Sequence, residues 1–182
     1  LRGTNPLESW GVDWVSNRAA ALGYKSPQVD QALRLVAKLQ MVEPSAMGSL
    51  SFTGHSLGGG LAGLMAVFFH KPAVTFATAP FERSAVDDTA AEFLAGPSEH
   101  HVAEYFDDYA GYAKGFGLTT GDLSAEFKAY KDSWQVSNAA GLTEFQQREG
   151  QVQDYFSTGD PVHFLELAYP AVAAVRHEHE IW

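Results

Sequence analysis

A serine flanked by two glycines offers the clearest chemistry in the sequence. Ser56 stands in a Gly-x-Ser-x-Gly pattern that begins at Gly54 and ends at Gly58. The alternating residues 50–53 predict a short strand before it, and the apolar spacing after it predicts a helix over 59–69. A serine held in such a sharp turn exposes its hydroxyl, and the glycines avoid collisions between Cβ atoms and backbone. The pattern predicts a nucleophile; the alternative is a glycine-rich turn that merely begins a helix.

A serine hydroxyl reacts slowly at neutral pH unless a base lies within hydrogen-bond reach. Where the nucleophile sits on a strand-to-helix turn, an acid and then a histidine follow it along the chain. Asp160, just after a predicted strand over 151–157, is the expected acid, although Gly-Asp-Pro is also ordinary turn chemistry. Asp154 is the second choice because it falls inside that strand. Of the seven histidines, His177 is the expected base and His179 the alternative.

Acyl transfer to a serine also needs two backbone N–H groups that stabilise the negative charge on the carbonyl oxygen. Leu57, the residue after the nucleophile, is expected to supply one of them. The second must come from a loop on a neighbouring strand, and residues 1–5 are the candidate.

The elements that must position these residues alternate between strand and helix. Ser26-Pro27 predicts the start of a helix that runs to about Gln40, with Pro27 at the first helical position. Strands are predicted over 50–53, 72–78 and 151–157, and the one over 72–78 is expected to be buried. This alternation predicts an α/β fold with a mostly parallel sheet flanked by helices.

Residues 82 to about 150 have a different character. Small and charged residues dominate, and aromatic residues recur at helical spacing. The segment predicts three or four short helices inserted into the α/β frame. They form either a helical cap packed on the sheet or a lid that lines a substrate pocket, and most of the tyrosines are expected in the core.

Composition limits the class of protein. The 182 residues are 46% apolar, which suits one globular domain. A formal charge of −10 argues against nucleic acid as a partner, and no apolar run approaches a transmembrane segment. There is no cysteine for a disulfide or thiolate site. These features fit a soluble protein, secreted or not, and leave its compartment open. The chain opens on what reads as a strand end, so we expect earlier strands to lie outside it.

Four blocks of this sequence resemble the class 3 lipases, a family of α/β-hydrolase esterases and phospholipases. The nucleophile block over 52–62 matches the family almost letter for letter. The others are an oxyanion loop, an acid turn and a histidine block: Arg2-Gly3-Thr4 with Trp10 and Asp13, Gly159-Asp160-Pro161-Val162, and His177 with Glu180-Ile181-Trp182. The resemblance implies that Thr4 supplies the second oxyanion N–H.

The resemblance also implies a function. It predicts a single α/β-hydrolase domain over 1–182, interrupted by the helical insertion at 82–150. It predicts hydrolysis of lipid carboxylic esters through an acyl-enzyme, with no metal or organic cofactor and with a lipid or other ester as substrate. Transient contact with a lipid interface is compatible with it. Two alternatives stay open: an esterase, thioesterase or acyltransferase for non-lipid acyl groups, and a lipid-binding module that has lost catalysis.

Overall fold

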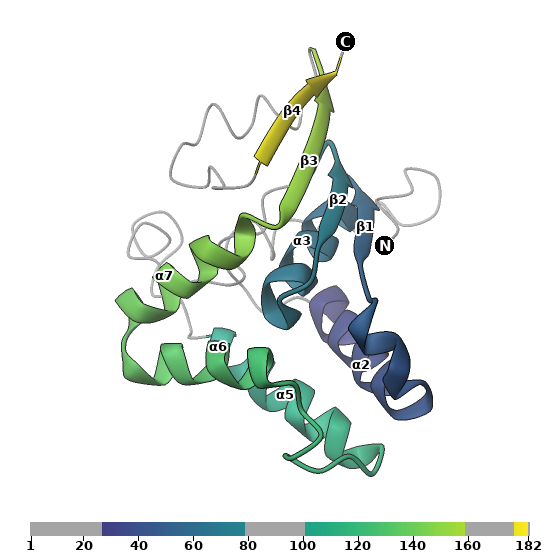
Figure 1. The fold of residues 1–182 in the computed structure, drawn as a ribbon, viewed down its shortest axis with the longest axis vertical. Coiled ribbons are helices and arrows are strands. Elements are labelled where there is room, and N and C mark those ends of the chain that lie inside the picture. Colours follow the sequence, from purple (N-terminus) through teal and green to yellow (C-terminus); the bar gives the residue numbers. More distant parts are fainter. Residues whose placement is uncertain (1–26, 79–100, 159–176, 182) are drawn as a thin grey trace.

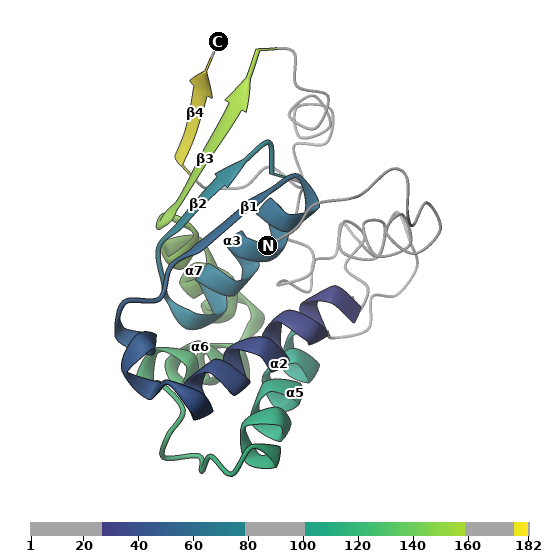
Figure 2. The ribbon, with the colours of Figure 1, turned by 90° about the vertical axis from the view of Figure 1, so that its right-hand side faces the viewer.

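The computed structural model describes residues 27–78, 101–158 and 177–181. Its centre is a sheet of four parallel strands in the order β1-β2-β3-β4. The strands lie side by side in Figures 1 and 2, and α2, α5 and α6 lie at the end of the molecule away from β4. The bounds of the strands are β1 Phe52–His55, β2 Ala73–Phe76, β3 Val152–Ser157 and β4 His177–Ile181. The predicted α/β fold with a parallel sheet is therefore confirmed.

Helix α3 (Leu57–Phe69) connects β1 to β2 and is the centre of the core. All of its residues are buried, because apolar side chains cover every side of the helix. Its first turn is Leu57 followed by three glycines, which lets the helix start directly against the end of β1. The helix predicted over 59–69 is confirmed, with two more residues at its start.

Helix α2 (Pro27–Val42) begins at the predicted proline and runs two residues beyond the predicted end. It buries one apolar stripe and packs mainly against α5 (His101–Gly115). A short 3-10 helix η1 (Pro44–Gly48) then leads to β1. That strand starts at Phe52, two residues later than predicted, because Leu50 packs against the core before the sheet begins.

In the described part of the segment that the sequence assigns to inserted helices, residues 101–150, there are three helices. They are α5, α6 (Ala125–Val136) and α7 (Asn138–Glu149). Serine side chains cap α6 and α7, since Ser124 accepts from the N–H of Phe127 and Ser137 from that of Ala140. The aromatic residues of α5 and α6 interleave with those of α3 in one buried cluster: Phe68, Phe69, Tyr105, Phe106, Tyr109, Phe127 and Tyr130. The core position expected for most tyrosines is therefore confirmed for Tyr105, Tyr109 and Tyr130.

A buried arginine joins three of the helices. Arg148 of α7 is 1% exposed and pairs with Glu144 at 2.7 Å. Its guanidinium also donates to the carbonyl of Val67 at 3.2 Å and to that of Glu126 at 2.6 Å. It lies over the ring of Tyr130, with 4.8 Å between the guanidinium carbon and the ring centroid. Because the last carbonyls of α3 have no partner inside their own helix, Arg148 acts as its C-terminal cap.

The two faces of the sheet differ in burial. Ala73 and Thr75 of β2 are buried, whereas Val74 and Phe76 are 43% and 42% exposed. On the exposed face, Phe76 stacks on Tyr155 with ring centroids 5.8 Å apart. The helices therefore cover one face of β2, and the other face presents apolar and aromatic side chains.

Candidate functional site

Ser56 lies between β1 and α3 in the strand–turn–helix arrangement that its sequence context predicts. Its backbone has φ 54° and ψ −125°, outside the regions that residues with a Cβ usually adopt. Its N–H donates to the carbonyl of Phe76 at 2.9 Å, and its own carbonyl accepts from the N–H of Gly60 at 3.1 Å. Such strain costs about 1–3 kcal/mol and persists mainly where function requires it.

Gly54 explains why the turn can be so tight. A Cβ placed on Gly54 would fall closer than 3.0 Å to the carbonyl carbon and oxygen of Gly58, a separation that real Cβ atoms essentially never show. The first turn of α3 thus passes directly over the strand. Only glycine fits at position 54, because any side chain there would collide with the backbone of Gly58.

The residues expected around the serine fall into three groups. Leu57 is the first residue of α3, so its N–H belongs to the helix N-terminus, where N–H groups have no partner inside the helix. Thr4 and Asp160 lie outside the described residues. Asp154 is inside β3 and 2% exposed, and it accepts hydrogen bonds from Thr75 and Thr78.

Both candidate bases lie in β4. The backbone of His177 is level with Gln153 of β3, and its side chain is outside the described residues. The Nε2 atom of His179 lies 2.7 Å from Oε1 of Gln153, and its ring stacks on Tyr155 with centroids 4.9 Å apart. Neighbouring strands lie about 4.8 Å apart, so β4, the third strand from β1, is roughly 14 Å from it. This spacing applies to both histidines, because both belong to β4, and the described contacts of His179 are with β3.

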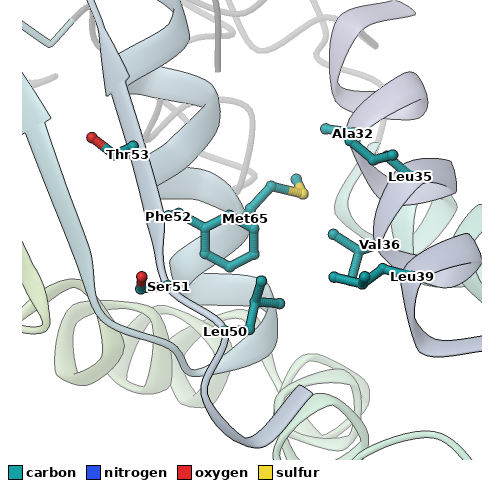
Figure 3. A pocket seen from close by; sticks show the side chains of 9 residues that line it. All are labelled: Ala32, Leu35, Val36, Leu39, Leu50, Ser51, Phe52, Thr53 and Met65. Atoms are coloured by element: carbon teal, nitrogen blue, oxygen red, sulfur yellow. The ribbon is translucent and has the colours of Figure 1, made fainter. Parts of the chain in front are cut away.

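An apolar groove of about 250 Å³ lies between α2 and β1 (Figure 3). Val36 and Leu39 face it from α2, while Phe52 and Met65 line the other side. The groove contacts the amino-terminal end of β1. Thr53 is the lining residue nearest to Ser56 along the chain; it is three positions before the serine, or about 10 Å along a strand. The groove is therefore distinct from the turn that holds the serine.

Residues 27–78, 101–158 and 177–181 contain neither a metal site nor a membrane-spanning helix. No group of three or more histidine, cysteine or acidic residues is placed to hold a metal ion there. In the same residues, no helix is both long and apolar enough to cross a membrane.

A known protein family matches the part of the chain that contains Ser56. The family model of the Tle-like phospholipase domain matches residues 1–109, which is more than half of the chain. The chain belongs to the Tle-like phospholipase family. The part matched to this family includes Thr4, Ser56 and Leu57, and it ends within α5. Asp160 and His177 lie beyond it.

The chain is also similar to the extracellular phospholipase A1 of Serratia liquefaciens. The two are 38% identical over 85 residues, which cover 44% of this chain and 26% of the relative. The chain thus spans about a quarter of the length of that relative. No solved structure matches the chain. These findings support the lipase or phospholipase class that the sequence blocks indicate.

Two residues had no recognised role in the sequence, one beside the site and one at the far end of α3. Thr78 follows β2 in a segment with no recognisable motif, and only the fold places it beside the first turn of α3. Arg148 appears in the sequence as an ordinary charged residue of a helix. Its i, i+4 spacing to Glu144 was a visible signal of a pair, but nothing in the sequence indicated its burial.

Proposed function

We propose that this protein is a serine hydrolase of lipid carboxylic esters, phospholipids among them, with a site of the class 3 lipase kind. The observation that carries the proposal is the backbone of Ser56, with φ 54° and ψ −125° between a parallel strand and a buried helix. The Tle-like phospholipase match and the phospholipase A1 relative support lipid esters as the substrate class. The exposed face of the sheet and the groove between α2 and β1 take no part in the proposal.

In the proposed reaction the hydroxyl oxygen of Ser56 attacks the acyl carbonyl carbon, and His177 takes the hydroxyl proton. Asp160 orients the imidazole and stabilises its positive charge. The N–H groups of Leu57 and Thr4 stabilise the oxyanion. The imidazolium then protonates the leaving alcohol, and water, deprotonated by the same histidine, releases the fatty acid and restores the serine.

His177 is preferred to His179 as the base. The ring of His179 is engaged by Gln153 and Tyr155 of β3, so it would have to leave both contacts to reach the serine. We also propose that residues 1–182 form one α/β-hydrolase domain. Its helical insertion at 82–150 then forms a cap, in which the aromatic residues of α5 and α6 pack against α3.

The test compares the wild type with Ser56→Ala on p-nitrophenyl esters and on vesicles of phosphatidylcholine. The variant is expected to lose at least about a thousandfold in kcat, because the chemistry passes through the hydroxyl. Ser51→Ala is the matched control, since Ser51 is an exposed serine just before the same strand. A fluorophosphonate probe should label Ser56 in the wild type and in the control.

Equal turnover by wild type and Ser56→Ala would overturn the proposal. Turnover of soluble esters or thioesters without any action on vesicles would instead favour the esterase or thioesterase alternative. A folded protein that neither labels nor turns over any ester would favour the non-catalytic alternative.

A further inference from the structure

A buried polar cluster lies beneath the turn that holds Ser56. At its centre is Asp154 of β3, which is 2% exposed. One of its oxygens, Oδ1, accepts a hydrogen bond from the hydroxyl of Thr75 at 2.8 Å and another from that of Thr78 at 2.5 Å. Both threonines are buried as well. A carboxylate is costly to bury unless its oxygens are hydrogen-bonded, so the cluster has a definite geometry.

Thr78 also touches the helix that follows the serine. A Cβ placed on Gly59 would lie 2.7 Å from Oγ1 of Thr78 and 3.2 Å from its Cα. All three atoms nearest to such a Cβ belong to Thr78. Gly59 is three residues after Ser56, in the first turn of α3. Thr78 therefore packs directly against the turn that presents the serine hydroxyl.

The chain reaches this position through a strained residue. Ala77 has φ 46°, in the left-handed region that residues with a Cβ rarely adopt. Its N–H donates to the carbonyl of Tyr155 at 2.8 Å, which extends the ladder between β2 and β3 by one bond. The left-handed backbone at Ala77 leads the chain directly to Thr78. Two neighbouring strands thus end in residues with positive φ, Ser56 after β1 and Ala77 after β2.

We propose that Asp154 and Thr78 are positioning residues for Ser56. The carboxylate fixes the hydroxyl of Thr78, and Thr78 fixes the first turn of α3 at Gly59. That turn sets the position of both the Ser56 hydroxyl and the Leu57 N–H. This inference rests on the proposed serine hydrolase function. Misplacement of a reacting group by about 1 Å can cost on the order of a hundredfold in rate.

Thr75 provides a matched control. It is as deeply buried as Thr78 and donates to the same oxygen of Asp154. However, Thr75 lies within β2 and supplies none of the atoms nearest to Gly59. Replacing either threonine with valine removes one hydrogen bond from the carboxylate, but only Thr78→Val also changes the contact with α3.

The experiment measures kcat, KM, the rate of fluorophosphonate labelling at Ser56 and the melting temperature. Thr78→Val is expected to lower kcat and the labelling rate about 10- to 100-fold with KM within about twofold. Thr75→Val should lower the melting temperature by the same amount as Thr78→Val but keep kcat within about threefold of the wild type. Thr78→Ser retains the hydroxyl and should recover most of the labelling rate.

Equal losses of kcat in the two valine variants, or full activity in Thr78→Val, would overturn the inference. Asp154→Asn, which removes the charge of the buried carboxylate, should also lower the labelling rate. If this variant fails to fold, the comparison of valine and serine at position 78 still decides. Failure of the proposed function has a different signature, because Ser56→Ala would then be as active as the wild type.

Discussion

The backbone N–H of Ser56 donates to the carbonyl oxygen of Phe76 at 2.9 Å. The residue expected to react therefore also makes the last hydrogen bond between β1 and β2. This bond anchors the serine to the sheet while its φ of 54° turns the chain into α3. Stability and reactivity are linked at this one residue, and substitutions there can separate them.

Replacing Ser56 with glycine should relieve the strain that a Cβ suffers at positive φ. We expect Ser56→Gly to be about 1 kcal/mol more stable than Ser56→Ala, because both variants lack the hydroxyl and only glycine adopts this conformation freely. Chemical denaturation of the two variants measures the difference. An alanine variant as stable as the glycine variant would show that the turn is not strained.

Gly54 should tolerate no side chain. Gly54→Ala places a methyl group against the backbone of Gly58, so we expect a loss of several kcal/mol or failure to fold. Gly48→Ala is the control, because nothing lies within 4 Å of a Cβ there. A Gly54→Ala protein that melts within a few degrees of the wild type would contradict the close approach of α3 to β1.

Arg148 should be more important for stability than its partner. Arg148→Met removes the cap of α3 and the bond to Glu126, and we expect a loss of about 3 kcal/mol. Glu144→Gln keeps an oxygen that can accept from Arg148 and leaves the carbonyl contacts in place, so it should cost less than Arg148→Met. Denaturant titration measures both losses. Equal losses would mean that the carbonyl contacts contribute little.

His70 should make stability depend on pH. Partial burial, and then the positive charge of Arg148, lower the pKa of His70, although Glu144 and Glu126 act in the opposite direction and Lys71 adds to the lowering. The folded state therefore binds a proton less readily than the unfolded state. The contribution of His70 is complete above about pH 6.5 and is lost as the pH falls below that value.

His70→Asn is the variant that tests this dependence, because asparagine tolerates the left-handed backbone at position 70, where φ is 51°. The free energy of unfolding of the wild type should fall relative to that of the variant as the pH is lowered below about 6.5. Parallel curves for the two proteins would exclude a role for His70.

Local pattern was sufficient to predict much of the fold. The glycines around Ser56, the proline at position 27 and the apolar spacing after position 60 each identify an element that the structure contains. Boundaries shifted where tertiary contacts decided them, as at Leu50. The site was less predictable, because Thr78 and Asp154 come together only across two strands, and burial of Arg148 depends on three helices. Thr4 and Asp160 stay predictions, since they lie outside the described residues, and so does the catalytic role of His177.

The bonds of Arg148 have a mechanical consequence. They tie α7 to the end of α3 and to the start of α6, while the other end of α3 carries Ser56. Movement of α6 and α7 away from α3 would break the hydrogen bonds of the Arg148 guanidinium to the carbonyls of Val67 and Glu126. These two helices are therefore held firmly against the end of α3 that lies away from Ser56.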